Sequence, residues 1–126
     1  MVKERYCSPE VSKLLKEKGF NEKVICYYDD GGSLKLNKFA EFQCCNQGYG
    51  SSVFAAPTQS MAMDWLREVH KISIEITSTG YLIDDDVKWE CDIKAGHRLY
   101  FRCITNEKSF KTCADAAIKY CLENLI

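Results

Sequence analysis

The chain places a loop of small and polar residues, Tyr49-Gly50-Ser51-Ser52, ahead of a segment with a helix-start signal, Thr58-Gln59-Ser60. Backbone amides at a helix N-terminus have no partner inside the helix, and the helix dipole favours negative charge there. The ring of Tyr49 can also stack on a base. The pattern predicts a contact with a phosphate or a nucleotide. A plain crossing between a strand and a capped helix is the alternative, because the loop carries no lysine.

Positive charge for such a ligand would come from arginines, whose planar guanidinium group matches the geometry of a phosphate. The chain offers Arg67, Arg98 and Arg102 for this role. The predicted ligand-binding residues are therefore Tyr49, Gly50, Ser51, Ser52, Thr58, Gln59, Ser60, Arg67, Arg98 and Arg102.

No catalytic motif accompanies this region. The chain has no G-x-S-x-G or H-E-x-x-H sequence and none of the glycine-rich phosphate-binding signatures. Its two histidines are His70 and His97, and no cysteine stands at a spacing that favours a Cys–His pair. His70 falls at a predicted helix C-terminus, where its charge suits the dipole. We predict no catalytic residue and no enzyme activity. A zinc- or thiol-dependent enzyme is an alternative that rests on cysteine and histidine content alone.

Eight cysteines are many for a chain of 126 residues. Zinc ligands usually come in closely spaced pairs, but the chain has no C-x-x-C and its closest pair is Cys44-Cys45. No apolar signal region follows the amino terminus, so an exported disulfide framework is not expected. We predict that most are reduced core thiols, with a metal site or functional disulfides as alternatives. The acidic run Asp84-Asp85-Asp86 lacks the alternation of a calcium loop and is interpreted as a solvated loop, so no metal or cofactor is predicted.

The composition limits the classes of partner that the chain is expected to bind. Hydrophobic residues make up 46% and charged residues 28% of the chain, as in ordinary soluble globules. The net charge of -1 gives no field that would recruit long nucleic acid or an anionic membrane, and no apolar run approaches the length of a membrane span. We expect one domain over residues 1–126, located in the cytoplasm.

Local signals define the elements that must position these residues. Caps and turns mark the boundaries, and apolar periodicity separates helices from strands. The predicted elements are a helix from Ser8-Pro9 to Gly19, a strand over 24–28, a hairpin turn over 29–32, a strand over 34–45 with a third strand as an option, a helix capped by Thr58, strands over 72–76, 87–93 and 99–104 with a turn at 95–97, and a final helix capped by Ser109. The positions predicted to face the core from the helices are Val11, Leu14, Leu15, Ala62, Trp65, Leu66, Val69, Cys113, Ala114, Ala117, Ile118, Cys121, Leu122 and Leu125.

The order of these elements is helix, hairpin, helix, three-strand meander and helix. Strands grouped in this way, without regular strand–helix–strand alternation, predict an α+β fold. Its sheet should be mostly antiparallel, with the long C-terminal helix packed on it. Aromatic residues on sheet faces and strand edges that need covering predict a homodimer or a higher homo-oligomer.

The run Ala56–His70, A-P-T-Q-S-M-A-M-D-W-L-R-E-V-H, resembles a group of short uncharacterised proteins encoded by phages and prophages of gut bacteria. The opening Ser8–Phe20 and the close Thr112–Ile126 look similar to theirs as well. The resemblance implies a small accessory protein and transfers no catalytic residue. In size and non-enzymatic character the chain also resembles phage sponges, which sequester nucleotide immune signals.

Two functions from different classes follow. The first is a non-enzymatic phage accessory protein that binds a small phosphorylated ligand and sequesters a nucleotide immune signal as an anti-defence sponge. The second is a protein-interaction module that inhibits or adapts a host protein through an aromatic sheet face. The expected partner is thus a nucleotide or a host protein.

Overall fold

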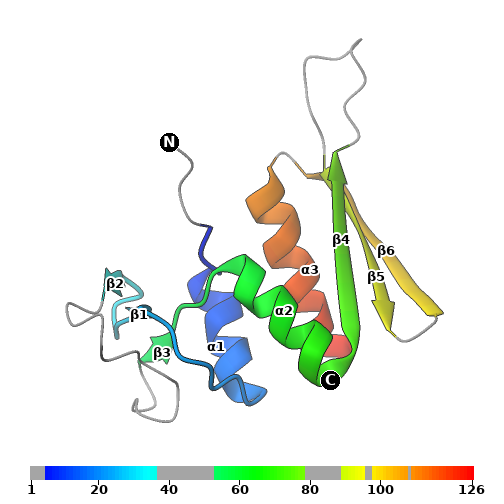
Figure 1. The fold of residues 1–126 in the computed structure, drawn as a ribbon. Helices are drawn as coiled ribbons and strands as arrows, with labels where there is room; N and C mark the ends of the chain where they lie inside the picture. The colour runs from blue at the N-terminus through cyan, green and yellow to red at the C-terminus, as the bar shows by residue number, and fades with distance from the viewer. Residues whose placement is uncertain (1–4, 37–52, 79–88, 96–97, 108) are drawn as a thin grey trace. The chain divides into compact units, whose positions relative to one another are not determined.

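The computed structural model describes residues 5–36, 53–78, 89–95, 98–107 and 109–126, and for 98–107 the backbone alone. The chain divides into two compact units, residues 1–62 and 63–126. The single domain that the sequence predicts over residues 1–126 therefore remains a prediction. The elements in chain order are α1 (Pro9–Glu17), β1 (Cys26–Tyr28), β2 (Leu34–Leu36), β3 (Phe54–Ala55), α2 (Gln59–His70), β4 (Ile72–Ser78), β5 (Trp89–Ala95), β6 (Arg98–Glu107) and α3 (Phe110–Asn124) (Figure 1). They confirm the predicted α+β class.

Helix α1 begins and ends as its sequence predicts. The side chain of Ser8 accepts a hydrogen bond from the Val11 amide, and a proline follows the cap. At the other end Gly19 has a φ of +95°, a conformation that suits glycine. The amide of Phe20 then donates to the Leu15 carbonyl at 2.9 Å, and its ring is buried. The chain therefore turns back onto its own helix.

The first sheet has the strand order β2-β1-β3, with both pairs antiparallel. The hairpin turn between β1 and β2 lies where predicted. The Asp29 carboxylate stabilises it by accepting hydrogen bonds from the amides of Gly31 and Ser33, each at 3.0 Å. Strand β2 ends at Leu36, and the rest of the predicted strand lies outside the described residues. Local patterns did not locate β3, which pairs with β1 on the side opposite β2.

The amino-terminal segment of the first unit also pairs with the chain just before α2. Tyr6 and Thr58 form an isolated antiparallel bridge. The amide of Cys7 donates to the Pro57 carbonyl at 2.9 Å, and the hydroxyl of Tyr28 donates to the Cys7 carbonyl at 2.5 Å. These bonds tie together segments that are far apart in the sequence.

Helix α2 has its cap where predicted, since Thr58 Oγ1 accepts from the Met61 amide at 3.2 Å. Three of the four positions predicted to face the core are buried, namely Ala62, Trp65 and Leu66. The fourth prediction is wrong, because Val69 is 54% exposed. The apolar side of this helix is therefore narrower than the sequence indicates.

The second unit contains the predicted meander, an antiparallel sheet of order β4-β5-β6. Helix α3 packs against all three strands. Its cap is Ser109, whose hydroxyl accepts from the Thr112 amide at 3.1 Å. Leu125 is half-buried. The predicted buried positions that are confirmed are Cys113, Ala114, Ala117, Ile118, Cys121 and Leu122.

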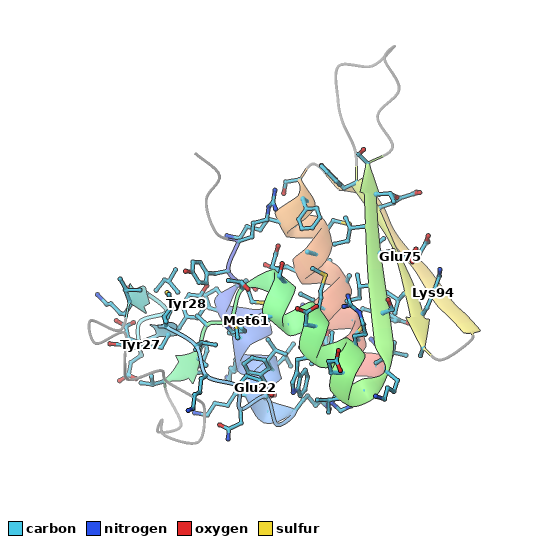
Figure 2. The ribbon with its side chains drawn as sticks, viewed as in Figure 1. Glu22, Tyr27, Tyr28, Met61, Glu75 and Lys94 are labelled. Carbon is cyan, nitrogen blue, oxygen red and sulfur yellow. The ribbon has the colours of Figure 1, made fainter. Side chains whose placement is uncertain are left out.

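The face of β4 and β5 that carries Glu75, Asp92 and Lys94 is polar. Glu75 on β4 lies opposite Asp92 on β5, so that two acidic residues are cross-strand neighbours. The ammonium group of Lys94 lies 3.4 Å from Glu75 Oε1 across the same pair of strands. Both side chains are labelled in Figure 2. Within the described residues, no helix has the length and apolar content needed to span a membrane.

Candidate functional site

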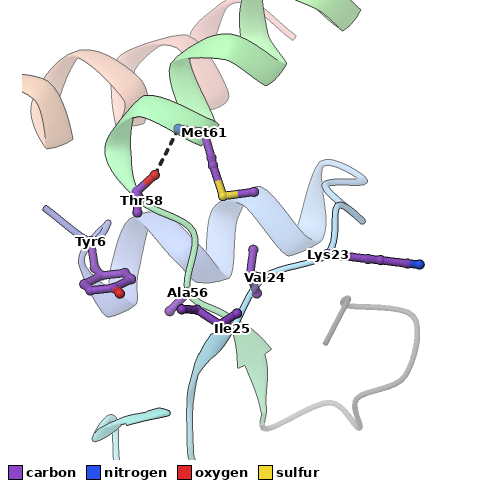
Figure 3. Close-up of a pocket in the computed structure, with 7 residues that line it drawn as sticks. All are labelled: Tyr6, Lys23, Val24, Ile25, Ala56, Thr58 and Met61. Atoms are coloured by element: carbon purple, nitrogen blue, oxygen red, sulfur yellow. Dashed lines mark hydrogen bonds between the residues drawn. The ribbon is translucent and has the colours of Figure 1, made fainter. Parts of the chain in front are cut away.

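The first unit contains an open pocket with a volume of about 330 Å³, drawn in Figure 3. Its walls come from three segments that the fold brings together: the amino-terminal stretch, the residues leading into β1, and the residues that join β3 to the first turn of α2. The lining residues are Tyr6, Lys23, Val24, Ile25, Ala56, Thr58 and Met61.

The bridge between Tyr6 and Thr58 holds one wall of this pocket together. A second backbone contact, from the Ala56 amide to the Cys26 carbonyl at 3.0 Å, fixes the segment before α2 beside β1. Main-chain pairing therefore helps to position the walls, together with the packing of Tyr6 and Ala56 in the small apolar cluster around Cys26 and Tyr28.

The lining is mainly apolar. Val24 is buried, Ile25 is 44% exposed, and the Met61 thioether points toward Val24 (Figure 3). Methionine is flexible and polarizable, so it adapts to irregular apolar ligands and to aromatic rings. Among the lining residues, Lys23 carries the one charge, and its end extends outward from the rim. The arrangement suits a ligand with an apolar body and an anionic group at its exposed end.

The start of α2 is already engaged by the chain itself. The Gln59 amide donates to the Arg5 carbonyl at 2.7 Å, and the Met61 amide donates to Thr58 Oγ1. The Ala62 amide makes the first bond within the helix, to the Thr58 carbonyl. Because these donors have protein partners, the helix start offers fewer amides to an anion than its sequence suggests.

The predicted site residues fall in different places. Thr58 lines the pocket, Gln59 is buried, and Ser60 is exposed. The loop residues Tyr49, Gly50, Ser51 and Ser52 lie outside the described residues. The described chain resumes at Val53, whose carbonyl accepts from the Lys16 ammonium at 2.7 Å. Strand β3 follows it, so the loop does not lead directly into α2.

The three predicted arginines belong to the second unit, whereas the pocket is built from the first. Arg67 is exposed and forms an ion pair with Asp64 at 3.1 Å, one turn earlier on α2. Arg98 and Arg102 are on β6, where the register sets Arg102 opposite Asp92 and Arg98 opposite Ala95. Arg67 thus has an ion-pair partner on its own helix, and Arg98 and Arg102 are placed by the register of their strand.

Sequence reasoning missed most of the pocket. Tyr6, Lys23, Val24, Ile25 and Met61 carry no motif. The sequence pattern predicts a strand that includes Val24 and Ile25, but β1 begins after them, at Cys26. No local signal marks the pairing that brings Tyr6 to Thr58, because it joins distant segments.

Among the described histidine and cysteine side chains, His70 and Cys121 have surroundings that bear on their chemistry. His70 ends α2 as predicted, and its ring lies 4.8 Å from that of Trp65 in an edge arrangement. His97 lies outside the described residues. Burial, followed by the proximity of Cys91, raises the pKa of the Cys121 thiol to about 12. A thiol with so high a pKa is a poor nucleophile at neutral pH.

The described cysteines behave as apolar core residues. Cys7, Cys26, Cys91, Cys113 and Cys121 are buried, free thiols. Cys44 and Cys45, like the acidic run Asp84–Asp86, lie outside the described residues, and Cys103 is described by its backbone alone. Among the described side chains, no group of three or more acidic, cysteine or histidine residues is arranged to hold a metal ion.

No family model, curated protein or solved structure matches this chain.

Proposed function

We propose that this protein is a non-enzymatic binding protein that takes a small phosphorylated ligand into the pocket beside the start of α2. The supporting observation is the pocket itself, whose lining combines the Thr58 hydroxyl, apolar walls and, at the rim, the positively charged Lys23. A volume of about 330 Å³ falls in the range of small-molecule sites. The resemblance to phage accessory proteins extends this proposal to the sequestration of a nucleotide immune signal in the cytoplasm.

The test is calorimetry with a panel of linear and cyclic nucleotides, using the wild type and two variants of Met61. Met61 is the third residue of α2, three positions after the capping Thr58. A glutamate or glutamine there completes a capping box with threonine, so Met61→Glu and Met61→Gln both preserve the helix start. They differ in charge within the pocket.

Ligand binding should be lost in Met61→Glu, because the carboxylate repels an anion and disfavours an apolar group. Met61→Gln should retain weakened binding, and both variants should melt near the wild-type temperature. The proposal is abandoned if no nucleotide binds the wild type, or if Met61→Glu binds as well as Met61→Gln. The ligand-binding role of Tyr49 can be tested in parallel with Tyr49→Ala, which removes a stacking contribution of about 1–3 kcal/mol.

A specific observation favours the second candidate, a protein-interaction module. Leu34 and Leu36 on β2 are 43% and 63% exposed. In the β1–β2 register they lie opposite Tyr28 and Cys26, which are buried, so they continue the core-side face of the hairpin. Exposed apolar side chains of this kind suit contact with a host protein or with a second copy of the chain.

This candidate predicts that Leu36→Ser abolishes a host-protein complex, or the homodimer, without lowering the melting temperature. The measurement is light scattering of the purified wild type and variant, alone and with the captured host protein. A wild type that is monomeric at micromolar concentration and captures no partner contradicts it.

A further inference from the structure

We propose that the pocket recognises a ligand with one ring system and a single anionic group, of the nucleoside monophosphate type, and that the ring enters the pocket while the anion stays at the rim beside Lys23. This inference rests on the proposed function and specifies its ligand class. It departs from the expectation that backbone amides at the start of α2 hold the phosphate.

The size of the pocket limits the ring component. About 330 Å³ lies near the lower end of the range for small-molecule sites. A pocket of this size suits one ring system better than the two of a dinucleotide. Its inner walls are apolar, from Val24, Ala56 and Met61, and the aromatic ring of Tyr6 adds a surface for stacking.

The occupied helix start keeps the anion out of the interior. The amide of Gln59 is bonded to the Arg5 carbonyl, and the amide of Met61 is bonded to the Thr58 hydroxyl. A phosphate placed there would have to displace bonds that the fold already makes, and it would lose its hydration among apolar side chains.

The remaining charge is at the rim. Lys23 is exposed, and its side chain extends away from Thr58 and Met61 (Figure 3). One solvated ammonium balances about one negative charge, and its contribution is modest because water screens the pair. Additional phosphates would therefore find no further positive partner among the lining residues.

The test compares adenosine, AMP and ATP, the matching guanine series, and inorganic phosphate, by calorimetry at low salt. Lys23→Ala removes the rim charge, and Lys13→Ala, at an exposed position on α1 outside the lining, is the matched control. We expect a monophosphate to bind about 2- to 5-fold more tightly than its nucleoside. We expect the triphosphate to gain little more, and inorganic phosphate alone not to bind.

Lys23→Ala should make the nucleoside and the monophosphate equal in affinity, whereas Lys13→Ala should leave their difference unchanged. Strong binding of inorganic phosphate, tenfold tighter binding of the triphosphate than of the monophosphate, or an unchanged preference in Lys23→Ala overturns the inference while leaving the proposed function standing. If no nucleoside or nucleotide binds the wild type, both the inference and the proposed function fail.

Discussion

Thr58 and Met61 are joined by a hydrogen bond from the Met61 amide to Thr58 Oγ1, at 3.2 Å, and both side chains line the same pocket. The contact that starts α2 is therefore also part of a pocket wall. A change at Thr58 should act on the helix first and on the pocket through it.

We expect Thr58→Ala to lower the free energy of unfolding by about 1 kcal/mol, because the Met61 amide loses its capping partner. Thr58→Ser keeps a hydroxyl at the same position and should stay close to the wild type. Urea denaturation measures both. Equal stability of Thr58→Ala and Thr58→Ser would show that the cap contributes nothing.

Two serines of the α1 region should respond oppositely to the same substitution. Ser12 is fully buried, and its hydroxyl has no hydrogen-bond partner among the described residues. Ser12→Ala should raise the free energy of unfolding by about 1 kcal/mol, since it removes an unsatisfied polar group and improves helix propensity. Ser8→Ala should lower it by about 1 kcal/mol, since it removes the cap that holds the Val11 amide. Thermal melts of the two variants decide this, and a destabilised Ser12→Ala would indicate that the hydroxyl is satisfied.

Ile118 lies fully buried on α3, so Ile118→Asp should unfold the second unit by placing an unpaired charge in its core. The substitutions Ile118→Lys and Val69→Lys form a matched pair. The sequence pattern predicts that both positions face the core, but only Ile118 is buried, so the pair separates the effect of burial from that of the pattern. Val69→Lys should change stability by less than about 0.5 kcal/mol, since Val69 is exposed and a cation suits a helix C-terminus. Circular dichroism and thermal melts report the outcome, and a cooperatively melting Ile118→Asp protein would contradict the assignment of the α3 core face.

The Cys121 thiol links stability to alkaline pH. Its pKa is raised from 9.0 to about 12 in the folded chain, by burial and then by Cys91. Below pH 9 both the folded and the unfolded chain hold this proton. Between pH 9 and 12 the unfolded chain loses it first, so the free energy of unfolding should fall as pH rises, by up to about 1.4 kcal/mol per pH unit.

The control for this prediction is Cys121→Ala, which lacks the titrating group. Urea denaturation at several values between pH 8 and 10.5 should give a shallower decline for Cys121→Ala than for the wild type. Parallel declines would mean that the thiol does not contribute to the pH dependence.

The sequence alone determined the features that depend on neighbours within a few residues. The caps at Ser8, Thr58 and Ser109 are bonds to the amide three positions later, and the turn at Asp29 closes on Gly31 and Ser33. Such bonds are encoded by short patterns, so they can be predicted without a fold. The same holds for the buried side of α3, where helical spacing and burial agree.

Only the tertiary structure decided the features that join distant segments. The pairing of Tyr6 with Thr58 and the position of β3 beside β1 depend on which segments meet after the chain has folded. The pocket, with the charge of Lys23 at its rim, depends on both of these arrangements. The exposure of Val69 is likewise a matter of what packs against α2, which helical periodicity cannot specify. Periodicity indicates which side of an element is apolar, whereas the width of the covered surface is set by its tertiary neighbours.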